Sequence, residues 1–196
     1  GFSKRVNVLK RRVKDRMLNS RRIQCFDLTP SAMRSAFQKV VEFKPEFLIG
    51  VSATTIAFCR TNRAGADACR RLRLKCVMCT AGALTEEERG EIAAFFDAPV
   101  CMQYGTVECG DMAHMVPSGG YNVYWQSHLM QTIPGFEGAR KNIVTCLTSR
   151  YLPFIRYDVG DFIELYPDET VRPHRFISVH GRPNDVITFS DGTAVY

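Results

Sequence analysis

Two patterns of apolar residues alternate along the first half of the chain. Apolar residues three and four positions apart predict helices, and the short apolar runs between them predict buried strands. Thr29 followed by Pro30 has the N-cap and first-turn chemistry of a helix start, and that helix must end before Pro45. Thr85 and Glu88 form a second start signal, the capping box. The predicted inward faces of these two helices are Met33, Phe37, Val40 and Val41, and Ile92, Phe95 and Phe96.

Further helices and strands alternate around these two helices. A basic amphipathic helix is predicted near the start of the chain, where Val6, Leu9, Val13 and Met17 share one face. Another helix is predicted over 54–62. The predicted strands cover 23–26, 47–51, 75–79 and 99–103. The strand over 47–51 is predicted to be buried. Such alternation predicts a parallel sheet flanked by helices.

The pattern changes in the second half, where short β-rich stretches are separated by glycine and proline turns. These stretches are 121–125, 127–131, 142–147, 161–166 and 175–180. The predicted fold class is therefore α/β, with a partial parallel sheet flanked by helices followed by a small antiparallel β-barrel-like subdomain. The predicted division places the α/β part at 1–120, the barrel-like subdomain at 121–180, and a hinge with the start of a small domain at 181–196.

Composition limits the class of protein. The chain has 196 residues, of which 45% are hydrophobic and 23% charged, as in soluble globular proteins. No apolar run reaches the roughly 20 residues of a membrane span, and no signal-peptide pattern is present. Eight cysteines are fewer than the roughly 8–10% of residues that mark a disulfide scaffold. We therefore expect reduced, mostly buried thiols and a cytoplasmic location.

Charge is unevenly distributed. The first 75 residues carry 18 Lys and Arg against 5 Asp and Glu, whereas the remainder carries 8 against 15. A basic half raises the possibility of nucleic-acid binding, but aromatic residues are not interleaved with the basic ones and no recognition motif is present. A solvated helix face is the favoured interpretation. A positive field that attracts phosphates is compatible with it.

Cysteine and histidine offer only partial sites. Cys76 and Cys79 have the spacing of half a zinc site, but no second pair follows, and in a strand they point to opposite faces. Buried thiols are therefore favoured. Cys109, His114 and His128 give a weaker alternative, either a partial zinc cluster or a Cys109–His114 nucleophile pair.

Two loops follow predicted strands, at the sheet edge where parallel α/β proteins bind ligands. The first contains Ala81 and Gly82, and the second runs over 104–108. Glycine lets a backbone approach a ligand closely, and Glu108 offers the hard oxygen that suits Mg²⁺. Plain turns are the alternative for both loops.

Two later clusters contain charged residues beside glycine. In 153–161, Asp161 can accept hydrogen bonds from two ribose hydroxyls, and the alternative is a hairpin turn with a solvated Asp. The second cluster, 181–187, is followed by Asp191 and Gly192. Its alternative interpretation is an inter-subdomain loop and a hairpin.

Taken in this order, the clusters resemble the acyl-adenylate-forming superfamily, and within it the phenylacetate–CoA ligase and CapK-type branch. The resemblance covers roughly residues 40–196. The motifs are Thr-Glu-Glu-Glu-Arg at 85–89, Tyr-Gly-x-x-Glu at 104–108, Pro-x-x-Arg-Tyr-x-x-Gly-Asp at 153–161, and Gly-Arg-x-x-Asp-x-Ile at 181–187. It implies that a carboxylate and ATP give acyl-AMP and pyrophosphate, after which a thiol, commonly coenzyme A, takes the acyl group.

The resemblance also implies a role for each matching residue. Ala81 and Gly82 would form the adenine wall, with Tyr104 and Gly105 lining the adenine and acyl sites. Thr106 would touch the α-phosphate, and Glu108 would bind Mg²⁺. Asp161 would hold the ribose hydroxyls, and Arg182 would lie near the ribose and phosphates. Asn184 would lie at the hinge of a mobile C-terminal domain.

Two expected parts of such an enzyme are absent from this sequence: the Ser/Thr/Gly-rich phosphate loop and the lysine of the C-terminal domain. The chain is therefore expected to be the middle of a larger aryl- or acyl-CoA ligase and to lack adenylation activity alone. One alternative is a CapK-like protein that activates an acid for polysaccharide or natural-product assembly without coenzyme A. Another is a non-catalytic binding module that uses the basic face. The sequence does not identify the acyl substrate.

Overall fold

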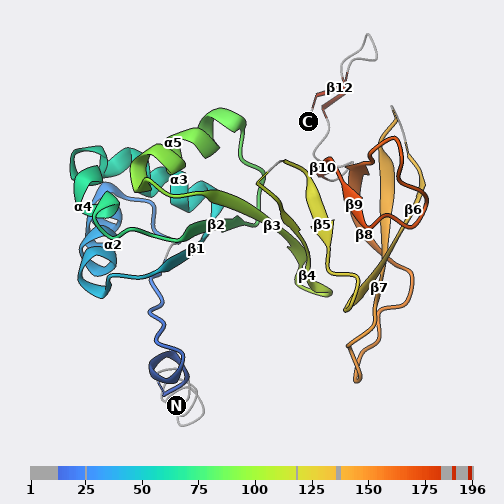
Figure 1. Cartoon of the computed structure of the whole chain (residues 1–196), viewed down its shortest axis with the longest axis horizontal. Helices are drawn as coiled ribbons and strands as arrows, with labels where there is room; N and C mark the ends of the chain where they lie inside the picture. The colour runs from blue at the N-terminus through green and yellow to red at the C-terminus, as the bar shows by residue number, and fades with distance from the viewer. Residues whose placement is uncertain are drawn as a thin grey trace. The chain divides into compact units, whose positions relative to one another are not determined.

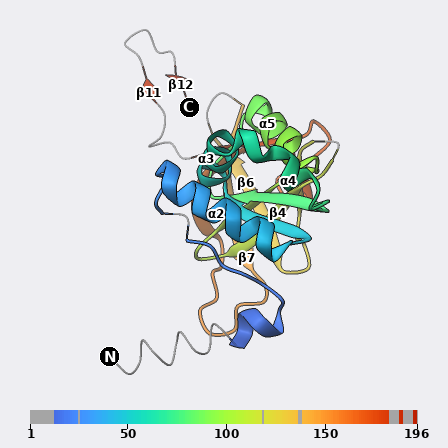
Figure 2. The same ribbon diagram turned by 90° about the vertical axis from the view of Figure 1, so that its left-hand side faces the viewer.

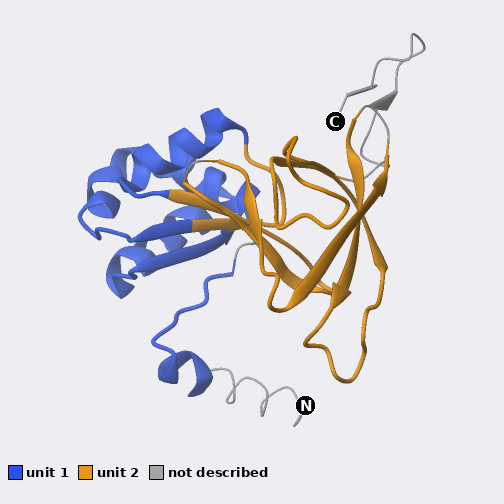
Figure 3. Ribbon diagram, turned by 45° about the vertical axis from the view of Figure 1, so that its right-hand side comes forward, with its two compact units in different colours: residues 1–77, 85–99 blue, residues 78–84, 100–196 orange. Residues whose placement is uncertain are grey.

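The computed structural model describes residues 13–24, 26–117, 119–135, 138–181, 187–188 and 194–195. The chain divides into two compact units (Figure 3). Unit 1 comprises Gly1–Val77 and Thr85–Pro99, and unit 2 comprises Met78–Leu84 and Val100–Tyr196. No helix within the described ranges has the length and apolar character needed to cross a membrane.

Unit 1 contains the helices, which gather around its strands (Figures 1 and 2). Its elements are α2 (Pro30–Phe43), β1 (Phe47–Val51), α3 (Ser52–Thr61), the 3₁₀ turn η1 (Arg63–Gly65), α4 (Ala66–Arg70) and α5 (Glu86–Phe96). Strand β2 (Cys76–Thr80) begins in unit 1 and ends in unit 2.

The two helix starts predicted from capping chemistry are confirmed. The Thr29 side chain accepts a hydrogen bond from the Ala32 amide, and Pro30 opens α2. At α5 both halves of the capping box are formed between Thr85 and Glu88. Local chemistry of this kind fixes a helix end without help from distant residues. The buried residues are Met33, Ala36 and Val40 in α2, and Ile92, Phe95 and Phe96 in α5.

Aromatic packing and one buried amide hold α3 against its neighbouring helices α2 and α5. The ring of Phe58 lies 6.0 Å from that of Phe96 and 6.2 Å from that of Phe37. At the end of α3, buried Asn62 donates from Nδ2 to the carbonyls of Met33 at 3.2 Å and Phe58 at 2.8 Å. One side chain therefore bonds the backbone of both helices.

We expect Asn62→Ala to lower the free energy of unfolding by about 1–3 kcal/mol, because the two carbonyls lose a buried donor. Chemical denaturation followed by circular dichroism measures the change. Gln38→Ala is the control, since Gln38 is an exposed residue of α2 and its loss should change stability by about 0.5 kcal/mol or less. Equal effects of the two substitutions would contradict the role given to Asn62.

The predicted strand over 23–26 is wrong. Residues 20–24 have no regular structure, and the side chain of Phe26 is 92% exposed. A strand forms only where another strand pairs with it, and so short an apolar run carries no information about a partner. The buried character predicted for 47–51 is also wrong in part, since Phe47 and Ile49 are 54% and 67% exposed. The predicted N-terminal helix is helical over 13–17, and its earlier residues lie outside the described ranges.

The larger sheet has the strand order β1-β2-β3-β4-β5-β9. Strands β1 to β3 form the predicted parallel part, and the remaining pairs are antiparallel. The strands that follow β2 are β3 (Val100–Thr106), β4 (Gly110–Met115), β5 (Tyr121–Val123), β6 (His128–Pro134), β7 (Arg140–Cys146), β8 (Tyr157–Glu164), β9 (Arg175–Phe176), β10 (Ser178–Gly181), β11 (Ile187–Thr188) and β12 (Ala194–Val195). The α/β class is therefore confirmed.

A second, four-stranded antiparallel sheet lies within unit 2, in the order β10-β8-β7-β6. It is open, with β10 and β6 as its outer strands, so the antiparallel prediction is confirmed but the sheet does not close into a barrel. Residues 147–156 connect β7 to β8 as a loop in which most side chains are exposed.

Strand β8 contains a bulge opposite β7. Lys141 pairs with Phe162, but Ile143, two residues later, pairs with Asp158, four residues earlier. Gly160 lies inside this bulge with φ 81°, a left-handed conformation that suits glycine. The bulge sets the position of Asp161, described below.

Candidate functional site

Tyr104, Gly105 and Thr106, predicted to lie in a loop, belong to the end of strand β3. Only residues 107–109 form the turn, and the chain then returns antiparallel as β4, a strand that the sequence analysis missed. The Thr106 hydroxyl oxygen accepts a hydrogen bond from the Cys109 amide at 3.0 Å, which closes the turn. Thr106 thus has a structural task, and its hydroxyl proton is still able to donate.

Gly105 is required by backbone packing. A Cβ built at this position would lie 2.5 Å from the Gly110 carbonyl oxygen and 3.0 Å from Asp111 Cα. The β3–β4 register shifts between Tyr104 and Gly105, so the two backbones approach closely there. The sequence predicted a glycine that approaches a ligand. The close approach of the two strands is a second reason for glycine at position 105.

Glu108 occupies the exposed part of the same turn. Within the described part of the chain, no hydrogen bond or ion pair engages its carboxylate. Its carboxylate therefore has no structural bond in that part of the chain. The carboxylate has the chemistry of a Mg²⁺ ligand, because Mg²⁺ takes one or two protein carboxylates and keeps several waters.

Asp161 lies in strand β8, where the sequence analysis expected a turn between two β stretches. The bulge described above replaces that turn. Asp161 is 9% exposed, so the alternative of a solvated Asp is wrong. A buried carboxylate requires hydrogen-bond donors, since an unsolvated charge is costly.

One donor to Asp161 is Tyr104, which lies 57 residues earlier in the chain. The Tyr104 hydroxyl donates to Asp161 Oδ2 at 2.9 Å. Asn142 Nδ2 in turn donates to the Tyr104 hydroxyl at 3.1 Å. All three side chains are buried in unit 2. The structure thus brings together two residues predicted from separate motifs and adds Asn142, which the sequence analysis missed.

The Tyr104 phenol remains protonated. Burial of the ring, followed by the neighbouring Asp161 carboxylate, raises the pKa of Tyr104 far above its ordinary value. The hydroxyl is therefore a donor at any physiological pH. Its proton is therefore available for the hydrogen bond to Asp161 Oδ2.

Ala81 and Gly82 follow β2, also in unit 2, and both are exposed. Ala81 has φ 57° and Gly82 has φ 148°. A left-handed alanine costs roughly 1–2 kcal/mol relative to its ordinary conformation, so the loop leaves β2 through a strained residue. Strained backbone of this kind is typical of ligand-binding loops.

Two predicted site residues, Arg182 and Asn184, lie outside the described residues, and their roles stay predictions.

The cysteine and histidine alternatives gain no support. His128 Nε2 lies 2.8 Å from the Cys109 carbonyl, to which it donates, and Nδ1 contacts the Ser127 hydroxyl at 2.9 Å. His114 stacks on Tyr124 with ring centroids 5.0 Å apart. No disulfide joins the described cysteines, and nowhere in the described ranges do three potential metal ligands cluster. These histidines have structural contacts.

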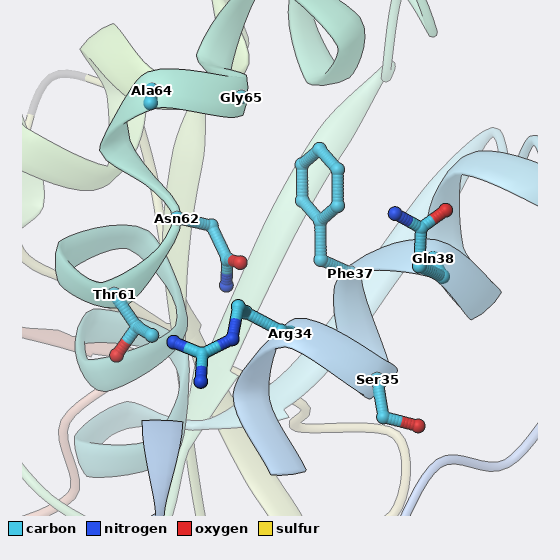
Figure 4. Close-up of a pocket in the computed structure, with 8 residues that line it drawn as sticks. All are labelled: Arg34, Ser35, Phe37, Gln38, Thr61, Asn62, Ala64 and Gly65. Atoms are coloured by element: carbon cyan, nitrogen blue, oxygen red, sulfur yellow. The ribbon is translucent and has the colours of Figure 1, made fainter. Parts of the chain in front are cut away.

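A groove of about 430 Å³ lies in unit 1 between α2 and the segment after α3 (Figure 4). Phe37 forms its apolar part, and Arg34 extends from α2 toward Thr61. The lining residues are Arg34, Ser35, Phe37, Gln38, Thr61, Asn62, Ala64 and Gly65. None is a predicted site residue, and the groove contains no carboxylate, histidine or cysteine.

Solved structures resemble the chain in fold. No protein-family model matches it, and no curated protein is significantly similar in sequence. A 2-hydroxyisobutyryl-CoA ligase in the postadenylation state superposes with a TM-score of 0.72 at 19% identity, over 86% of this chain and 39% of the ligase. An anthranilate CoA ligase in complex with anthranoyl-AMP superposes with a TM-score of 0.58 at 11% identity, over 85% of this chain and 35% of the ligase. Coronafacic acid ligase from Pectobacterium brasiliense superposes with a TM-score of 0.58 at 11% identity, over 86% of this chain and 35% of that ligase.

The chain therefore has the fold of part of an acyl-adenylate-forming ligase. It spans less than half of the length of each of these structures. At sequence identities this low, the similarity is a similarity of fold alone.

Proposed function

We propose that the chain is part of an ATP-dependent carboxylate-activating ligase and that unit 2 carries its adenylate site. The observation that supports this most is the buried hydrogen bond from Tyr104 to Asp161. Two motifs chosen from the sequence for nucleotide contacts meet at one place inside a single compact unit. The fold likeness to ligases solved with acyl-AMP supports the same assignment.

In the proposed site, Asp161 accepts hydrogen bonds from the ribose hydroxyls, and Tyr104 holds the carboxylate. Ala81 and Gly82 form the adenine wall. Thr106 donates its hydroxyl proton to the α-phosphate. Glu108 would hold Mg²⁺, which when bound offsets the charge of the phosphates.

The proposed reaction joins a carboxylate oxygen to the α-phosphorus of ATP and releases pyrophosphate. The chain's contribution is to hold the nucleotide so that the attack is in line. Coenzyme A is the proposed acceptor of the acyl group, because the ligases with this fold include a complex with coenzyme A. The phenylacetate–CoA ligase and CapK-type branch, the domain boundaries at 120 and 180, and the hinge at Asn184 belong to the same proposal.

Equilibrium binding tests the proposal directly. Isothermal titration of the chain with AMP, and with a non-hydrolysable acyl-AMP mimic, should show one site, with the mimic bound more tightly than AMP. GMP and CMP are the controls, since an adenine wall should reject them. Equal affinity for the three nucleotides would contradict an adenylate site.

We expect Glu108→Gln to raise the Mg²⁺ concentration needed for half-maximal ATP binding several-fold, because the amide keeps the shape of the side chain and loses the charge that attracts the cation. AMP binding without metal should be unchanged. The measurement is ATP binding over a Mg²⁺ series. Glu87→Gln, an exposed carboxylate of α5, is the control and should leave the Mg²⁺ dependence unaltered. An identical dependence in both variants would remove Glu108 from the metal site.

A further inference from the structure

We propose that Asn142 is a positioning residue of the adenylate site, acting on the Asp161 carboxylate through the Tyr104 hydroxyl. The inference rests on the proposed function, since it concerns the carboxylate that would take the ribose hydroxyls. Nothing in the sequence motifs marks Asn142, which lies in the middle of strand β7.

With the Asn142 amide oriented as it is in the structure, the hydrogen-bond chain runs in one direction. The amide Nδ2 of Asn142 can donate and cannot accept. The Tyr104 hydroxyl therefore accepts at 3.1 Å from Asn142, and its single proton is committed to Asp161 Oδ2 at 2.9 Å. Without Asn142, the tyrosine hydroxyl would be able to rotate its proton away from the carboxylate.

Backbone geometry explains why Asn142 reaches this place. Its neighbours Lys141 and Ile143 pair with Phe162 and Asp158, so Asn142 lies level with the bulged residues of β8. Asp161 is among those bulged residues. The same irregularity that buries the carboxylate therefore brings the asparagine beside it.

The free-energy cost of burying this amide indicates that it has a role beyond packing. Asn142 is 0% exposed, and its Oδ1 lacks a hydrogen-bond partner within the described residues. An unpaired buried acceptor destabilises the fold, and an apolar side chain of similar volume would avoid that cost. A stability role alone would favour leucine at this position.

The consequence concerns orientation of the carboxylate. A carboxylate can accept about four hydrogen bonds, so the bond from Tyr104 fixes its plane and leaves capacity for a ligand. A ribose presents two adjacent hydroxyls, and holding both requires a carboxylate that does not rotate. Asn142 should therefore control how well the site distinguishes ribose from deoxyribose.

The test is the ratio of the dissociation constants for 2′-deoxy-AMP and AMP. Hydrogen bonds to a charged group predict a ratio of roughly 10 or more for the wild-type chain. Asn142→Leu and Tyr104→Phe should each lower the ratio at least three-fold, and the double variant should lower it no further, since both act through one hydroxyl. Thr132→Val is the control: Thr132 is buried, pairs directly with Asn142 and bonds to Arg140. It should leave the ratio unchanged.

The outcomes separate the inference from the function on which it rests. A wild-type chain that binds no AMP, or that does not distinguish the two nucleotides, overturns the proposed ribose site and the inference with it. If Asp161→Asn abolishes the preference for AMP over 2′-deoxy-AMP, the ribose site stands. If Asn142→Leu and Tyr104→Phe then leave the ratio unchanged, the inference alone is overturned. Tyr104→Phe carries the test if Asn142→Leu fails to fold, and an unchanged ratio in that variant overturns the inference.

Discussion

Replacing Asp161 by Asn should weaken AMP binding to the chain by roughly 10- to 100-fold. The ribose hydroxyls would lose a charged acceptor, and hydrogen bonds to charged groups contribute about 1.5–3 kcal/mol each. The asparagine Oδ1 could still accept from the Tyr104 hydroxyl, but its NH₂ group would then replace the second carboxylate oxygen by a donor. Isothermal titration of the wild-type and variant chains measures the change.

Asp158→Asn is the matched control for this prediction. Asp158 lies three residues earlier in the same strand, and Lys141 binds its carboxylate at 2.6 Å and lowers its pKa. The substitution removes the same charge from the same strand but leaves the buried network intact. It should leave AMP affinity within about two-fold of wild type, because exposed ion pairs contribute little. Equal losses in both variants would indicate a general electrostatic effect and would remove the specific role from Asp161.

Gly105→Ala should lower the free energy of unfolding by about 1–3 kcal/mol, because an added methyl without space forces the backbone to shift. The added methyl would meet the carbonyl oxygen of Gly110 at 2.5 Å, and a backbone atom held in a strand pair cannot move aside cheaply. Thermal denaturation should show a melting temperature lower by several degrees.

Gly90→Ala gives the opposite expectation in the same assay. Gly90 lies in α5, and a Cβ built there meets nothing within 4 Å. Alanine in an open helical position should therefore raise stability by about 0.5–1 kcal/mol. If both substitutions shifted stability in the same direction, the close approach of β3 and β4 would not explain the glycine at 105.

Helix starts were predictable because their chemistry is local. Thr29, Pro30, Thr85 and Glu88 act on amides within three residues, so the sequence contains the whole interaction. Strands depend on partners far along the chain. The apolar run at 23–26 finds no partner, and β4 was missed because its pairing with β3 is visible only after the turn at 107–109 is known.

The candidate site divides in the same way. Tyr104 and Asp161 were predicted because each belongs to a motif that can be read within a few residues. Asn142 could not be predicted, because its position beside them depends on the register shift between β7 and β8. The environment of Asp161 was also misjudged, since the same bulge buries a residue that the pattern placed in a turn.

The loop over 147–156 has a practical consequence for engineering. Asp161 and Asn142 lie within the strands that this loop joins, and Tyr151, near the middle of the loop, is fully exposed. Doubling the length of a flexible loop costs only about 0.6 kcal/mol. A peptide tag or a fluorophore-bearing segment inserted between Arg150 and Tyr151 should therefore leave the strand register intact. Such an insertion offers a labelled chain in which ligand binding is followed by fluorescence. Removing one residue from the bulge of β8, in contrast, would change the irregular register that positions Asp161.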